Sequence, residues 1–193
     1  MKKIYTFVVV LMLLILTSPL VNSCMKGPED PIISFRSRKS RLTGEWNLTS
    51  GNTDGTLSNG QGSVTFSSTF DGATETDIFD NQYFTHPYTE KLEFSKDNIF
   101  KSTVLDNTET TIRNGFWAFM DGYNYFHNKE CVVIRLSSQI IGDSIKTYTG
   151  DNMPNYILRF DKLSNSEAII GSYGQTIGTT TNSNSSTKTY TKK

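Results

Sequence analysis

Cysteine and histidine are almost absent from this chain. Of its 193 residues, only Cys24 and Cys131 carry a thiol, so the folded part lacks the even cysteine set of a disulfide-stabilised domain. The two histidines, His86 and His127, exclude a histidine-rich zinc site. The chain also lacks phosphate-binding and dinucleotide-binding glycine motifs and the Gly-x-Ser-x-Gly element of hydrolases. We therefore expect no cofactor, no metal site, no catalytic residues and no enzymatic activity.

An excess of charge of either sign is also missing. Lys plus Arg and Asp plus Glu each number 19. This balance argues against a nucleic-acid partner, which would require a basic surface. The basic residues gather in one short stretch, which we interpret as the solvated face of a short helix, although contact with anionic lipid head groups is an alternative. Its members are Arg36, Arg38, Lys39 and Arg41.

The first 23 residues have the three parts of an export signal. Lys2 and Lys3 form a positive start, Phe7 to Leu16 is an unbroken apolar run, and Pro19 lies shortly before a small-residue cleavage site. A membrane-spanning helix needs roughly 20 apolar residues, about twice the length of this run. The pattern predicts a signal peptide over residues 1–23, cleaved between Ser23 and Cys24.

The residues around this site, Val21-Asn22-Ser23-Cys24, resemble the lipobox of bacterial lipoproteins. The resemblance implies that Cys24 becomes the new N-terminus and carries fatty acyl chains such as palmitate. Asn22 lies where a small residue is more usual. Ordinary signal peptidase could cut at the same bond and leave Cys24 unlipidated, which is the alternative.

Residues 24–41 have the composition of a tether. Gly27, Pro28 and Pro31 disfavour regular structure. The apolar spacing from Ile32 to Leu42 allows one short helix lying across the domain. Lys26, Glu29 and Asp30 loosely resemble a surface-display signal, so we expect a lipid-anchored protein of the outer membrane, with display at the cell surface favoured over a periplasm-facing orientation.

From Leu42 onward the sequence predicts an all-β domain, residues 42–193. Apolar and polar side chains alternate along successive segments separated by turn-forming residues, and no amphipathic helix intervenes for parallel crossovers. Closure of such a chain removes exposed edges. We predict an antiparallel up-and-down barrel of about eight to nine strands over residues 44–49, 64–70, 88–94, 99–105, 110–120, 131–137, 155–161, 167–173 and 187–192. Residues 51–62 and 179–187 are expected to be flexible loops.

The first expected strand contains Gly44-Glu45-Trp46, which resembles the Gly-x-Trp opening of lipocalin-like barrels. Gly115-Phe116-Trp117 and Thr189-Tyr190-Thr191-Lys192 are similar to segments of bacterial lipoproteins with such a domain. The resemblance implies that Trp46 plugs the closed end of the barrel and that Gly44 allows close packing beneath it. The last strand offers Lys188, Lys192 and Lys193 where larger lipocalins place an arginine on the tryptophan.

A barrel of this size can hold one small ligand or be filled by its own side chains. We expect capture of a small apolar or amphipathic ligand, in a cavity lined by residues such as Phe66, Phe94 and Phe116, with the ligand-binding residues otherwise undetermined. The alternative is a structural or protein-interaction module with a filled core. Further aromatic residues near Phe116 are expected in the core or at the barrel mouth: Trp117, Phe119, Tyr123, Tyr125 and Phe126. Cys131, beside Glu130, is expected to be a buried structural thiol.

Overall fold

The computed structural model describes residues 37–59, 62–120, 130–173, 176–177 and 180–193. Residues 1–36, which include the expected signal peptide, most of the expected tether, Ser23 and Cys24, lie outside the described residues. Within these residues the chain is nearly all β, as the sequence predicts. A five-residue helix, α2 (Arg38–Leu42), and a short 3₁₀ turn, η3 (Gly150–Asn152), are its helical elements.

The strands follow one another in an antiparallel sheet. Their bounds are β1 (Gly44–Asn59), β2 (Gly62–Phe70), β3 (Thr74–Phe79), β4 (Gln82–Phe94), β5 (Ile99–Asp106), β6 (Glu109–Met120), β7 (Glu130–Ile141), β8 (Ser144–Thr147), β9 (Asn155–Leu163), β10 (Glu167–Tyr173), β11 (Thr176–Ile177) and β12 (Thr180–Lys192).

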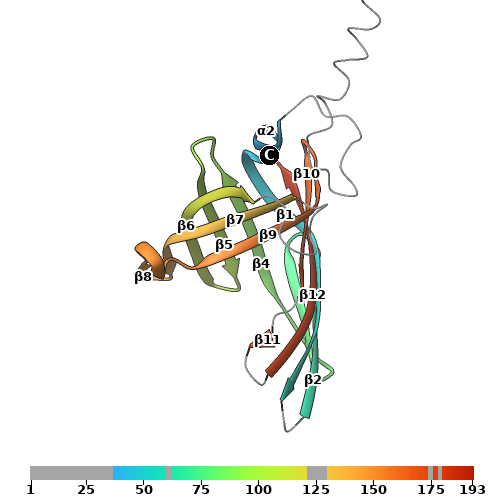
Figure 1. Ribbon diagram of the computed structural model, residues 1–193. Coiled ribbons are helices and arrows are strands. Elements are labelled where there is room, and N and C mark those ends of the chain that lie inside the picture. The colour runs from blue at the N-terminus through green and yellow to red at the C-terminus, as the bar shows by residue number, and fades with distance from the viewer. Residues whose placement is uncertain (1–36, 60–61, 121–129, 174–175, 178–179) are drawn as a thin grey trace, which may run out of the picture.

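The sheet closes on itself because β12 pairs with β1. Ten strands form the closed antiparallel barrel, slightly more than expected: β1 to β7, β9, β10 and β12. At one end of the barrel β1 also pairs directly with β4, through four residue pairs from Gly44–Phe94 to Asn47–Lys91, and bypasses β2 and β3. The barrel is therefore narrower at this end, which α2 covers (Figure 1).

The sheet continues away from the narrow end as a long ribbon (Figure 1), which consists of the second half of β1, β2, β3, the first half of β4 and the first half of β12. Two of the expected loops are wrong here: residues 51–59 continue β1, and residues 180–187 belong to β12. Each segment gains a ladder partner, since residues 51–58 of β1 pair with β12 on one edge and with β2 on the other. Backbone pairing on both edges overrides the weak strand preference of Gly, Ser and Asn.

Tight turns join the neighbouring strands where the sequence offers turn residues. Asp80 and Asn81 both have positive φ angles, of 49° and 62°, and form the two-residue link between β3 and β4. This backbone geometry matches the twist of a β-hairpin and tolerates Asp and Asn. The strand β3 was not expected. Its pairing partner β4 is longer than predicted and includes His86.

The barrel core fills the closed end and the middle of the molecule. Alternation along each strand directs one set of side chains inward. Those that pack together include Trp46, Leu48, Phe94, Trp117, Ile134 and Phe160. Phe94 packs edge-on against Trp117, with ring centroids 5.8 Å apart. Several core residues, among them Ile134, also line the cavity described next.

Candidate ligand-binding cavity

A cavity of about 280 Å³ lies inside the barrel and is lined in part by residues of the packed core. Its lining comes from β4, β5, β6, β7, β9 and β12. An interior of this volume could hold roughly nine water molecules, at about 30 Å³ each, or an organic molecule of about ten non-hydrogen atoms. The cavity is therefore large enough for a small ligand.

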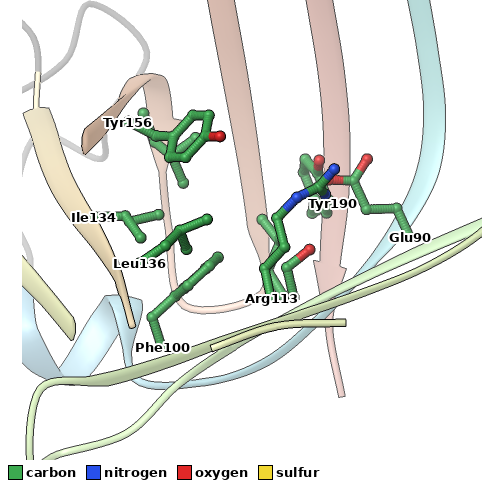
Figure 2. A pocket seen from close by; sticks show the side chains of 10 residues that line it. Glu90, Phe100, Arg113, Ile134, Leu136, Tyr156 and Tyr190 are labelled. Atoms are coloured by element: carbon green, nitrogen blue, oxygen red, sulfur yellow. The ribbon is translucent and has the colours of Figure 1, made fainter. Parts of the chain in front are cut away.

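One wall of the cavity is apolar. Phe100, Ile134 and Leu136 lie together on this side, with Tyr156 at its edge (Figure 2). The register explains their meeting, because Ile134 pairs with Tyr156 across β7 and β9, and both side chains point inward. Leu92 and Leu158 complete the apolar lining.

The opposite wall is polar and carries charge. Glu90, Arg113 and Tyr190 lie on this side (Figure 2), and Ser102 also lines the cavity. Lys188 Nζ donates to Glu90 Oε2 at 2.6 Å, and Tyr88 Oη donates to the same oxygen at 3.2 Å. The Glu90 carboxylate is thus neutralised by Lys188 and held by hydrogen bonds.

Both tyrosines beside Glu90 are held in the protonated form. Burial, followed by the negative charge of Glu90, raises the pKa of Tyr190 well above its ordinary value of 10.0. The same two causes raise the pKa of Tyr88 above its usual range. Neither hydroxyl is suited to proton transfer near pH 7, because an efficient general acid or base has a pKa close to the working pH.

Arg113 is the cation of the polar wall. It lies in the middle of β6 and pairs in register with Ser102 of β5, so both side chains face the cavity. Arg113 is half-buried, and no ion pair or hydrogen bond joins its guanidinium to another residue within the described ranges. Sequence alternation places Arg113 on the same face of β6 as Trp117, but the structure is needed to show that this face is the inner one and that Arg113 makes no ion pair with Glu90 on the same wall.

Trp46 and Gly44 lie at the narrow end of the barrel, where β1 pairs with β4. Trp46 is almost completely buried, and its Nε1 donates to the Leu42 carbonyl at 2.7 Å. Lys192 Nζ lies 5.1 Å from the centroid of the Trp46 ring, in the position that the lipocalin resemblance assigns to an arginine. The φ angle of Gly44, 139°, favours glycine, whereas a Cβ there would meet only the flexible end of the Lys192 side chain.

The helix α2 is fixed to this end by a buried ion pair. Arg41 Nη2 lies 2.8 Å from Glu130 Oε1, and the two residues are 2% and 1% exposed. Arg38 Nε lies 3.4 Å from the same oxygen, and the Arg38 guanidinium stacks 4.3 Å above the Phe119 ring centroid. The expectation of a solvated basic face is therefore wrong for Arg41, because Glu130 at the start of β7 draws it into the interior.

The residues expected to line a cavity are not the ones that do so. Phe116 is 54% exposed and points outward, because its neighbours Trp117 and Phe119 occupy the inner face of β6. Phe94 belongs to the packed core, and Phe66 lies on the ribbon beyond the barrel. Tyr123, Tyr125 and Phe126 fall outside the described residues.

Cys131 and the two histidines are the remaining residues that the sequence analysis considered. Cys131 is buried in β7, as expected for a structural thiol. His86 Nε2 lies 3.0 Å from Asp106 Oδ1 at the root of the ribbon, and His127 is outside the described residues. Over the described ranges, no group of His, Cys, Asp and Glu has the arrangement of a metal site. No helix in the same part of the chain is long and apolar enough to cross a membrane.

Comparison of the chain with protein-family models, with curated proteins and with solved structures finds no match. The functional interpretation therefore depends on the barrel and its cavity.

Proposed function

We propose that this protein binds a small amphipathic molecule inside its barrel and does not act on it chemically. The observation that carries the proposal is the cavity of about 280 Å³ with one apolar and one polar wall. Ligand sites are typically concave and mostly apolar, with a few polar groups that set orientation. A binding role fits the surroundings of Glu90, since the Lys188 ion pair and the protonated tyrosines provide recognition rather than acid–base chemistry.

Filling the cavity tests this proposal. The Ser102→Phe variant places a ring in the cavity, whereas Thr103→Phe places the same ring on the outer face of β5. Titration calorimetry with octanoate, which has about ten non-hydrogen atoms, is expected to show binding by the wild type and by Thr103→Phe. We expect a loss of at least tenfold in affinity for Ser102→Phe. Equal affinity for all three proteins would place the ligand elsewhere and contradict the proposal.

We further propose that the domain is held at the outer membrane through acyl chains on Cys24, with surface display favoured. The lipobox-like sequence supports this location. Two or more acyl chains suffice for stable attachment, where a single chain is marginal. The protein is expected to incorporate radiolabelled palmitate in a bacterial host, and Cys24→Ser to remain unlabelled. Label on the Cys24→Ser protein would refute the assignment, and protease treatment of intact cells would report the orientation.

One observation favours the alternative function, a protein-interaction module. The inner face of the ribbon exposes Val64, Phe79 and Phe84, which are 38%, 48% and 52% exposed. The double variant Phe79→Ser/Phe84→Ser separates the two functions. If the double variant binds octanoate within twofold of the wild-type affinity, the cavity is supported as the binding site. If neither protein binds octanoate and the double variant loses a partner that the wild type crosslinks on host cells, the alternative is supported.

A further inference from the structure

We infer that the cavity selects anionic amphiphiles, molecules with a short apolar chain and an anionic head group, and that Arg113 binds the head group. This inference rests on the proposed function, because it names the ligand class of the same cavity. The placement of charge around the cavity leads to it.

The two charged side chains that line the cavity, Glu90 and Arg113, do not form an ion pair with each other. Glu90 contributes one negative charge and Lys188 compensates it at 2.6 Å. Arg113 adds a second positive charge, with no acidic partner in the described part of the chain. Among the described lining residues, Arg113 is therefore the charged side chain that has no ion pair. Arg113 is half-buried, and an anionic head group would supply a counter-ion to its guanidinium.

The chemistry of the guanidinium specifies the kind of anion. Arg presents a planar fork of N–H donors, which matches the two oxygens of a carboxylate or of a phosphate or sulfate ester. Ser102, 3% exposed and paired with Arg113 across β5 and β6, adds a hydroxyl to the same wall of the cavity. The Glu90 carboxylate would repel a second anion at its own oxygens, so the head group is directed to Arg113 and Ser102.

The other wall determines the rest of the ligand. Phe100, Ile134 and Leu136 face Arg113 across the cavity (Figure 2), so a chain attached to the head group would contact apolar side chains. Burial of each methylene contributes favourably to binding. A ligand of roughly ten non-hydrogen atoms, such as octanoate, matches the volume of this space.

Calorimetry with matched ligands tests the inference. Octanoate and 1-octanol share the chain and differ in charge, and octyl sulfate distinguishes an ester head group from a carboxylate. We expect the wild type to bind octanoate at least tenfold more tightly than 1-octanol, since hydrogen bonds to charged groups are the stronger ones. The Arg113→Met variant should lose about tenfold in octanoate affinity and change less than threefold for 1-octanol. Arg113→Lys should recover part of the preference.

The outcomes separate the two proposals. Equal binding of octanoate and 1-octanol by the wild type, or an unchanged preference in Arg113→Met, would overturn the inference and leave the proposed function standing. Failure of the wild type to bind any member of the series from butyl to dodecyl compounds would overturn both. The outward-facing Arg135→Met, on β7, is the matched control and should behave as the wild type. Circular dichroism of each variant verifies that it is folded.

Discussion

Tyr190 is the residue at which the packed core and the cavity meet. Its ring belongs to the core, and its hydroxyl lies at the polar wall beside Glu90. The neutral form is favoured there because burial and a neighbouring carboxylate both penalise the phenolate. Folding therefore protects the Tyr190 proton at a pH where an unfolded chain releases it.

The pH dependence of stability follows from this protected proton. A group whose pKa is raised on folding stabilises the protein fully below its unfolded pKa, here about 10. Above that pH the unfolded state loses the proton first, and the free energy of unfolding should fall by about 1.4 kcal/mol per pH unit for Tyr190. Urea denaturation between pH 8 and pH 11 measures this slope, and Tyr190→Phe should reduce it. Tyr83→Phe, at a site 73% exposed, should not. Identical slopes for wild type and Tyr190→Phe would show that this proton is not protected.

The short helix α2 is attached to the barrel by a buried ion pair. Arg41 reaches Glu130 across 89 residues of sequence and links the end of the tether to β7. Arg38 adds a second, longer contact to the same carboxylate. Because β7 lies in the barrel wall, this link fixes the start of the domain to its narrow end.

Removal of one partner of this ion pair should lower the free energy of unfolding more than replacement of both partners by apolar residues. Arg41→Met leaves Glu130 buried with its main counter-ion removed, and Glu130→Met leaves Arg41 in the same condition, so each should lower the free energy of unfolding by about 3–5 kcal/mol. The double variant Arg41→Met/Glu130→Met removes both charges and should recover most of the loss. Denaturant unfolding of all four proteins gives the coupling energy. Lys101→Met, which removes an exposed contact to Glu93 at 3.9 Å, should change stability by less than about 1 kcal/mol. If the double variant loses as much free energy of unfolding as the two single variants together, the two side chains are not coupled, and the buried ion pair is contradicted.

Sequence patterns predicted those elements in which alternation and apolar content agree. The strands β5, β9 and β10 begin at the expected residues, Ile99, Asn155 and Glu167, because each has a buried face. The second half of β1 and the first half of β12 were not predicted as strands, because their Ser, Thr, Asn and Gly residues are also typical of loops. Their strand structure depends on pairing between segments more than 100 residues apart, which no local pattern contains.

The candidate cavity was predictable as a type of site but not in its residues. Phe116 and Trp117 are adjacent aromatic residues, and alternation alone cannot say which faces inward. The grouping of Arg113, Glu90 and Tyr190 depends on the register of β4, β6 and β12. It therefore also depends on closure of the whole barrel. Residues of one strand become neighbours of another only through this closure.

As a whole, the molecule consists of a closed barrel and a ribbon that extends from it. In the barrel, β7 pairs with β6 and β9, and its inner side chains are buried in the core. In the ribbon, β3 pairs with β2 and β4, but its side chains are half-buried or exposed. The two parts therefore share one hydrogen-bonded sheet but differ in the apolar area that each buries.

Native-state hydrogen exchange should resolve this difference. The amides of Ile134 and Phe160, within the core, should open only with global unfolding, because their exposure breaks apolar packing on several strands. The amide of Ile78 in β3 should exchange through a local opening of lower free energy, since its exposure removes few buried contacts. Exchange measured in increasing sub-denaturing urea separates the two classes by their slopes. A bound ligand in the cavity should add protection to the Ile134 amide and leave Ile78 unchanged, because binding stabilises only the openings that release the ligand. Equal opening free energies for Ile78 and Ile134 would instead make the ribbon and the barrel one cooperative unit.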